Sequence, residues 1–215
     1  MSLNISLKYI LLILSSLLFI LISISGMLFP LIKFDFIYQY NLSIYPIEER
    51  TSLNLDEIKN TNNKIKNYFF SDEEFLDVEI FNNKEVIHMK DVKEIINNVF
   101  LFGKISCIAF VLLASFIIYK YKIYPHSIFK YSTMIFVFLI FFFSILTLIS
   151  FNQIFIIFHE IAFRNDLWLL NINEDYLLMM YPESFFRDVA ILLLISSLFI
   201  NFMMFYITNT LSKKL

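Results

Sequence analysis

The amino-acid sequence predicts an all-α membrane protein with four transmembrane helices and a small α+β extracytoplasmic subdomain between the first and second helices. Two observations predict this fold class. Of the 215 residues, 59% are hydrophobic and 17% are charged, whereas soluble domains carry about 25% charged residues. The uncharged residues also lie in long continuous runs. An ordinary soluble fold is therefore excluded, because so few polar residues could not cover its surface.

The composition excludes several other classes of protein. There are 2 glycines and 4 prolines, too few for a collagenous or low-complexity chain. Cys107 is the only cysteine, so a disulfide scaffold is excluded. The net charge of -2 gives no indication of nucleic-acid binding. We therefore expect membrane lipids, and no nucleic acid, among the partners of the chain.

The expected spans are the long runs that contain almost no charge. A helix needs about 20 apolar residues to cross the hydrocarbon layer of a bilayer. Four runs reach this length, at about 9–32, 95–119, 131–158 and 189–212, within a single membrane domain of residues 1–215. Lys104 interrupts the second run near one end, where its side chain can reach the interface. Cys107 lies in the same run, where we expect a buried and unreactive thiol.

The first run has two interpretations. Ser23 and Ser25 would be suitable small residues at the cleavage site of a secretory signal peptide. The apolar run, however, continues through residues 26–32, whereas the core of a signal peptide stops after about 7–15 residues. We therefore favour an uncleaved membrane anchor.

The charged residues predict the orientation of the chain. The N-terminus, the 120–130 connection and the C-terminus contain no acidic residue but six lysines, namely Lys8, Lys120, Lys122, Lys130, Lys213 and Lys214. The segments 34–94 and 159–188 contain all 19 acidic residues. The positive-inside rule therefore predicts that both termini are cytoplasmic and that both long segments are extracytoplasmic.

The segment 34–94 is long enough to have a structure of its own. From Leu55, apolar residues recur at helical spacing, and Asn54 stands before them as a possible N-cap. Val78 and Ile80 alternate with polar residues before the Asn82-Asn83 pair. This pattern is typical of a short hairpin, and it is the reason for expecting an α+β subdomain.

The segment 159–188 mixes charged residues with bulky apolar ones, as is typical of the lipid headgroup level. Trp168 is expected to be an interfacial anchor there. The stretch Asp175–Met180 is expected to form a short interfacial helix.

Histidine is the side chain best suited to accept and return a proton near neutral pH. His88 lies just before the second span and His159 at the outer end of the third. Residues at the same membrane depth on consecutive antiparallel helices can be neighbours, so these two form the candidate catalytic pair. Asp91 lies one helical turn after His88, and Asp166 can reach His159 if the chain turns back there. Either carboxylate would hold a ring nitrogen and fix the tautomer.

Structural explanations of the same residues compete with the catalytic one. Each histidine could simply be solvated at the interface, and Glu160, Arg164 and Asp166 could form a salt-bridge network. The sequence contains no glycine-rich phosphate loop and no Gly-x-Ser-x-Gly nucleophile motif, and no second histidine completes a zincin motif after His159. An enzyme built from these residues would therefore lack an obvious covalent nucleophile, and we expect no cofactor and no metal.

Four blocks of the sequence stand out, namely His88-Met89-Lys90-Asp91-Val92-Lys93, His159-Glu160, Asn165-Asp166-Leu167-Trp168-Leu169-Leu170 and Tyr181-Pro182-Glu183-Ser184-Phe185-Phe186. Together they resemble a bacterial family of four-span membrane proteins, the lipoprotein intramolecular transacylases (Lit). The first and third blocks are the specific part of this resemblance when they occur together. The resemblance covers essentially the whole chain in layout. Asn171-Ile172-Asn173 departs from the family, whose members often have Asp-Pro at this point.

The resemblance implies an acyltransferase of the bacterial cytoplasmic membrane with its active site on the extracytoplasmic side. Its substrates would be diacylated bacterial lipoproteins, whose N-terminal cysteine carries a diacylglyceryl group. The sn-2 acyl chain would move to the α-amino group of the same cysteine and give a lyso-form lipoprotein. The expected site residues are the catalytic His88 and His159, the orienting Asp91 and Asp166, and the oxyanion-stabilising Arg164 and Asn165.

Two other functions fit the sequence. One is a non-catalytic membrane accessory or binding protein, in which the polar residues merely pair with each other. The other is a lipid-ester hydrolase, in which the same histidines activate water. A separation of about 4–8 Å between the two histidine rings across one cleft would favour catalysis. Retention of both acyl chains on the product would distinguish transfer from hydrolysis.

Overall fold

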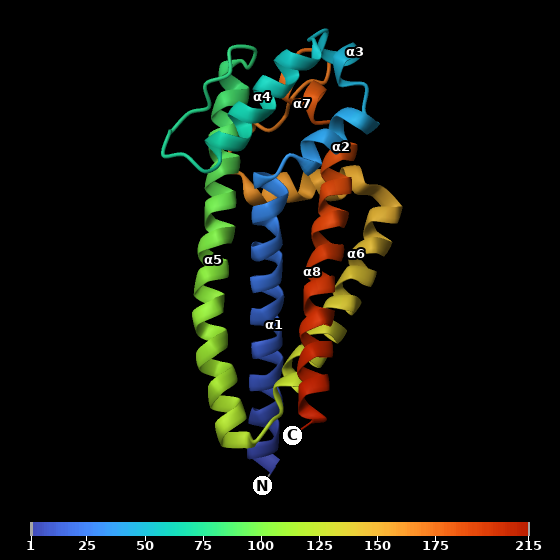
Figure 1. Ribbon diagram of the computed structural model, residues 1–215. Helices are drawn as coiled ribbons and strands as arrows, with labels where there is room; N and C mark the ends of the chain where they lie inside the picture. Colours follow the sequence, from blue (N-terminus) through green and yellow to red (C-terminus); the bar gives the residue numbers. More distant parts are fainter. Residues whose placement is uncertain (1, 215) are drawn as a thin grey trace. The chain divides into compact units, whose positions relative to one another are not determined.

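The computed structural model describes residues 2–214, apart from the side chains of residues 2–6, 148 and 149. Its helices, shown in Figure 1, are α1 (Ser2–Lys33), α2 (Phe36–Ile44), α3 (Ile47–Thr51), α4 (Leu55–Tyr68), α5 (Asn83–Tyr121), α6 (Pro125–Ala162), α7 (Tyr176–Met180) and α8 (Glu183–Ser212). No residue between 2 and 214 belongs to a strand. The all-α prediction is therefore confirmed, and the expected α+β subdomain is wrong.

The long helices confirm the prediction of four spans. Within the described residues, four segments are long and apolar enough to cross a membrane: Leu7–Lys33, Asn83–Tyr121, Pro125–Thr147 and Glu183–Ser212. Helix α5 has 39 residues and is therefore about 58 Å long, nearly twice the ~30 Å of a hydrocarbon core. Its first turns contain Lys84, Glu85, Lys90 and Asp91, and we infer that this charged end extends beyond the lipid.

The chain divides into two compact units. The first unit contains Met1–Leu28, Val99–Leu146 and Leu192–Leu215, which hold most of the apolar length of the four long helices. The second unit contains Phe29–Asn98 and Thr147–Ile191. Both acidic segments and the candidate catalytic pair therefore belong to the second unit.

Small and polar side chains join the helices of the first unit. Asn201 of α8 is fully buried, donates to the Ser23 hydroxyl of α1 at 2.7 Å and accepts a hydrogen bond from Ser132 of α6. A Cβ atom at Gly103 of α5 would overlap the side chain of Ser25. Close packing of this kind at small residues is typical of helices inside membranes.

Cys107 is exposed, so the expectation of a buried thiol is wrong. The buried face of α5 runs through Gly103, Ser106, Ala114 and Ile117, and residue 107 lies beside this stripe. The thiol therefore points away from the other helices of its unit.

Helix α4 begins where the sequence predicts. The Asn54 side chain accepts hydrogen bonds from the backbone N–H groups of Asp56 and Glu57, each at 3.0 Å. The Glu57 carboxylate accepts in turn from the Asn54 N–H at 2.8 Å, which completes a capping box. The helix buries Ile58 and Ile65, so the predicted amphipathic pattern is confirmed.

The expected hairpin is replaced by the start of α5. The Asn82 side chain accepts from the Glu85 N–H at 3.1 Å, and the Glu85 carboxylate accepts from the Asn82 N–H at 2.7 Å. This reciprocal cap begins a helix at the point where the Asn82-Asn83 pair suggested a turn. Glu85 is only 1% exposed, and its second oxygen accepts from the Leu177 N–H at 2.6 Å, which fastens α7 to α5.

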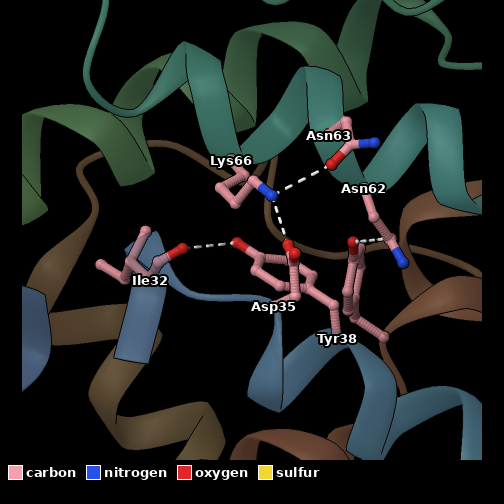
Figure 2. Close-up of polar contacts among 7 residues, drawn as sticks. Ile32, Asp35, Tyr38, Asn62, Asn63 and Lys66 are labelled. Carbon is pink, nitrogen blue, oxygen red and sulfur yellow. Dashed lines mark hydrogen bonds and ion pairs between the residues drawn. The ribbon is translucent and has the colours of Figure 1, made fainter. Parts of the chain in front are cut away.

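Further polar contacts hold the short helices of the second unit together. Figure 2 shows Lys66 of α4 in an ion pair with Asp35, which precedes α2. The Tyr38 hydroxyl of α2 donates to the Ile32 carbonyl at 3.2 Å. Asn41 of α2 donates to the last backbone carbonyl of α7 at 2.8 Å. Helix α7 also has the position predicted for the short helix in this part of the chain.

Candidate active site

The two candidate catalytic histidines are neighbours. His88 lies in the second turn of α5, and His159 lies close to the end of α6. The centroids of their rings are 6.1 Å apart, and the ring planes are inclined by 33°. Both rings are buried, with exposed fractions of 6% and 7%. The ring separation therefore falls in the range of about 4–8 Å that favours catalysis, while the cleft between the rings and the role of each ring stay predictions.

The last part of α6 carries His159. Ser150 has non-helical backbone angles (φ -166°, ψ 103°), so α6 is interrupted there and a second helical piece follows. The Asn152 side chain at the start of this piece donates to the Glu183 carboxylate of α8 at 2.7 Å. This contact fixes the helical piece within the second unit, and with it the position of His159.

The hydrogen bonding of His159 determines which of its nitrogens can act as a base. Its Nδ1 atom lies 2.6 Å from the backbone carbonyl oxygen of Phe155. A carbonyl oxygen can only accept, so Nδ1 carries the proton in this bond. The neutral ring then has its free lone pair on Nε2. Burial lowers the pKa of His159, and the hydrogen bond to Phe155 partly offsets this, which favours the neutral ring near neutral pH.

Aromatic rings surround the histidine pair. Four of them lie around His159, with ring-centroid distances of 4.2 Å for Phe155, 5.0 Å for Trp168, 5.2 Å for Phe158 and 5.4 Å for Phe163. Phe163 also lies 5.0 Å from His88, so it contacts both histidines. These rings shield the pair from bulk water.

The predicted partners of His88 have a different arrangement. The Asp91 carboxylate accepts a hydrogen bond from the Asn165 side chain at 2.9 Å. The Asn165 oxygen accepts from the Leu167 N–H at 3.0 Å. The Nδ1 atom of His88 is buried and has no hydrogen-bond partner among the described residues. Asp91 and Asn165 are therefore bonded to each other, and neither is hydrogen-bonded to the ring that Asp91 was expected to orient.

Arg164 and Asp166 lie near the pair in sequence but are exposed. Among the residues that the structure describes, the ion pairs do not involve them or Glu160. The salt-bridge network considered as a structural explanation is therefore absent from this part of the chain. The exposed side chains of Arg164 and Asp166 can therefore contact a substrate, and the roles of these two residues stay predictions.

The segment 163–175 is fastened to α5 on both sides of His88. Three hydrogen bonds do this: Asn165 donates to Asp91, Lys84 donates to the Leu169 carbonyl, and Asn82, the residue before α5, donates to Asp175. Positions 82 and 84 precede His88 and position 91 follows it. These contacts hold the segment across the histidine pair, so that Trp168 contacts His159.

Phe155, Phe163 and Lys84 were not recognised as site residues from the sequence. Phe155 contributes a backbone carbonyl, which gives no signal of its own in a sequence. Phe163 is one of 27 phenylalanines in the chain, so residue type alone could not single it out.

Across residues 2–214, no three His, Cys, Asp or Glu side chains come together as metal ligands.

Comparisons with known structures agree with this fold. The chain is similar to the membrane integral lipoprotein intramolecular transacylase Lit from Bacillus cereus, with a TM-score of 0.83 and 19% identity over 97% of both chains. Two variants of that protein, with one histidine replaced by arginine or by alanine, match with TM-scores of 0.82 and 0.81, also at 19% identity. They cover 99% of this chain and 95% and 97% of their own.

Sequence comparison identifies the family. No curated protein sequence matches the chain. A family model described as "Lipoprotein intramolecular transacylase Lit" matches residues 10–186, which is most of the chain and includes both histidines of the candidate pair. The chain therefore belongs to the Lit family of lipoprotein intramolecular transacylases and is an integral, multi-pass membrane acyltransferase.

Proposed function

We propose that the enzyme moves the sn-2 acyl chain of a diacylglyceryl-cysteine to the α-amino group of the same cysteine. The substrates are the diacylated N-termini of bacterial lipoproteins, and the product is a lyso-form lipoprotein. Family membership supports the reaction class. The observation that carries the proposal is the buried pair of histidine rings, 6.1 Å apart, neither of which is hydrogen-bonded to a serine or a cysteine among the residues that the structure describes.

The substrate supplies the nucleophile in this reaction. The amine nitrogen forms an amide bond with the sn-2 carbonyl carbon, and the bond between that carbon and the glyceryl oxygen breaks. The nitrogen enters as an ammonium and loses two protons. One proton passes through the enzyme to solvent, and the other ends on the departing glyceryl oxygen, which becomes a hydroxyl. An intramolecular attack held in the right geometry gains an effective molarity of about 10⁵–10⁸ M, so positioning supplies much of the rate.

We assign the two proton transfers to different histidines. His159 is the base for the ammonium, because its Nδ1 proton is held by the Phe155 carbonyl and its Nε2 lone pair is free. His88 relays the second proton. Burial, and after it the neighbouring His159, lowers the pKa of His88 to about 4, so the ring is neutral, takes this proton from the amine nitrogen and gives it to the departing oxygen. We assign to Arg164 the stabilisation of the negative charge that develops on the ester oxygen, because its side chain is exposed and has no ion-pair partner among the described residues. Asp91 acts through its bond to Asn165, which holds the segment 163–175 over the pair.

The distribution of charge supports an extracytoplasmic site. All 19 acidic residues lie in the segments 34–94 and 159–188, and the lysine-only segments lie at the other ends of the spans. We therefore infer cytoplasmic termini and an active site at the outer surface of the bacterial cytoplasmic membrane. The helical extension of α5 before residue 95 would bring His88 to the depth of a lipid ester.

The shielding of the histidines supports transfer over hydrolysis. A hydrolase that used the same residues would have to admit water to the ester, whereas both rings are buried among aromatic side chains. The amine of the substrate is already attached to the molecule that carries the ester, so it can enter the site with the ester.

The experiment that tests this function replaces the histidines one at a time. His88→Ala and His159→Ala should each reduce formation of N-acyl lyso-lipoprotein at least about 100-fold, as is typical for loss of a general acid or base. The assay is mass spectrometry of a diacylated reporter lipopeptide incubated with the enzyme in membranes. His126→Ala is the matched control, because His126 lies in the first unit with its Nδ1 atom 3.1 Å from the Ser212 hydroxyl.

The outcomes separate the proposed function from its alternatives. Loss of N-acyl product in both variants, with His126→Ala active, supports the proposal. Full activity in either histidine variant would overturn the assignment of that residue. Release of free fatty acid by the native enzyme would indicate a hydrolase, and an unchanged lipopeptide would indicate an accessory or binding protein.

A further inference from the structure

Trp168 lies against the ring of His159. The two ring centroids are 5.0 Å apart, and the ring planes are inclined by 33°. The indole therefore presents its face to the imidazole in a tilted stack. Trp168 is half-buried, and its backbone is held by the contacts that fasten the segment 163–175 to α5. If the imidazole becomes charged, this contact places a cation against the face of the indole.

The face of an indole attracts a cation whose distance from the ring centroid is within about 6 Å. When His159 takes a proton from the substrate, it becomes an imidazolium at this distance from Trp168. Tryptophan provides the strongest cation–π interaction of the aromatic side chains, and the interaction strengthens where water is excluded. His159 is only 7% exposed, so water is largely excluded and the cation–π interaction with Trp168 lies at the strong end of its range.

Among the described residues, no ion pair joins a carboxylate to His159 and provides the same stabilisation. The titratable ring that faces it from α5 is His88, whose charge would repel an imidazolium. The other charged side chains around the pair are bonded elsewhere or exposed. They are Lys84 and Asp91 of α5, bonded to Leu169 and Asn165, Glu183 of α8, bonded to Asn152, and the exposed Glu160, Arg164 and Asp166.

We propose that the indole of Trp168 stabilises the protonated form of His159 by a cation–π interaction and so sets the strength of the base. Trp168 is a positioning residue in this scheme, because it acts on His159 and not on the substrate. The inference rests on the proposed function in one respect, that His159 is the group that takes the proton. It gives Trp168 a role in the reaction beyond that of an interfacial anchor.

The experiment uses the fact that Trp168 is the only tryptophan in the chain. Replacement of all tryptophan by analogues with one, two or three ring fluorines therefore changes a single residue. Fluorine withdraws electron density from the ring face and weakens a cation–π interaction, while the shape of the side chain is nearly kept. An anchor that acts through its apolar body would be retained in every member of this series.

The measured quantity is the acidic limb of the pH profile of kcat/KM for N-acyl product formation. A weaker cation–π contact makes the imidazolium less stable, so His159 gives up its proton at lower pH. The limb should therefore move to lower pH with each added fluorine. Trp168→Leu should move it by about 1.5 pH units, which corresponds to the strength of such a contact where water is excluded. The plateau of kcat should fall in the same order, because a weaker base accepts the substrate proton less readily.

A second measurement needs no turnover. The ¹⁹F resonance of fluorinated Trp168 should titrate with pH in the native enzyme, with a midpoint that matches the acidic limb. The titration should be absent from the His159→Ala variant. This measurement keeps the proposal testable if Trp168→Leu does not fold. Ile172→Ala is the matched control, since Ile172 is an exposed apolar residue of the same segment and should leave the limb where it is.

The inference is overturned if the enzyme forms N-acyl product and the acidic limb does not move across the fluorinated series. A ¹⁹F resonance that fails to titrate would overturn it as well. The proposed function fails in a different way, by the absence of N-acyl product from the native enzyme or by full activity of His159→Ala. The two failures are therefore distinguishable in the same set of samples.

Discussion

Glu85→Ala should destabilise the second unit far more than an ordinary loss of a helix cap. The carboxylate accepts from the Asn82 N–H at 2.7 Å and from the Leu177 N–H at 2.6 Å, and it is 1% exposed. Its removal leaves one buried donor and one part-buried donor unpaired. A buried donor without a partner costs about 1–3 kcal/mol, and a typical hydrogen bond contributes about 1 kcal/mol. We therefore expect a loss of about 2–4 kcal/mol.

The chain contains a matched control for this prediction. Glu57 has the same place in the capping box of α4, but its bond to the Asn54 N–H is exposed, so water can replace it. Glu57→Ala should cost less than about 1 kcal/mol. Both glutamates close an Asn-x-x-Glu box, so the difference comes from the burial of Glu85 and from its second bond, to the Leu177 N–H.

Thermal unfolding in detergent measures the difference. About 1 kcal/mol shifts the midpoint of a chain of this size by roughly 2–4 °C, so Glu85→Ala should lower it by roughly 4–16 °C. Hydrogen exchange followed by mass spectrometry should also show faster exchange in α7, whose Leu177 N–H loses its acceptor. Equal midpoint shifts for the two variants, or unchanged exchange in α7, would refute the reasoning.

Three further predictions follow from the same contacts. Burial lowers the pKa of His159, so the acidic limb of the pH profile of activity should lie below the ordinary histidine value of about 6.5, with activity retained at higher pH. An acidic limb at or above this value would contradict the prediction. Asn165→Leu removes the donor to Asp91 and should reduce kcat about 10-fold in the lipopeptide assay, with little change in the melting midpoint. Gly103→Ala should lower the melting midpoint because its Cβ meets Ser25, and the added Ser25→Gly should restore it.

Local chemistry predicted the helices well where a single signal was present. The span positions follow from uncharged runs, and α4 follows from Asn54 and Glu57. The wrong prediction of a hairpin at Asn82 has an identifiable cause. An Asn-Asn pair favours a turn, but Asn82 with Glu85 three residues later is also a capping box, and the apolar run that follows makes the helix the longer structure. The sequence contains both the turn signal and the capping box, but only the capping box is supported by the apolar run that follows it.

The sequence predicted that His88 and His159 are neighbours, but it did not predict the hydrogen-bond partners of the side chains around them. Membrane depth brought His88 and His159 together, since both lie at the same ends of consecutive spans. Helical spacing put Asp91 on the same face of α5 as His88, yet Asp91 bonds to Asn165 from a segment 74 residues away. A sequence shows which residues share a helix face, but a distant segment that brings a better donor can change the pairing. The same limit applies to Trp168, whose contact with His159 depends on how the segment 163–175 is fastened.

That fastening leads to a prediction about side reactions. Lys84 donates to the Leu169 carbonyl, and this contact helps to hold the segment 163–175 across the histidines. Lys84→Ala should loosen the segment and admit water to the ester, so that part of the acyl chain is released as free fatty acid instead of being transferred. Mass spectrometry of the lipopeptide and of the released lipid gives the ratio of the two products. Lys59→Ala is the control, because Lys59 is an exposed lysine of α4. An unchanged ratio in Lys84→Ala, together with faster hydrogen exchange in the segment, would show that the segment does not exclude water from the reaction.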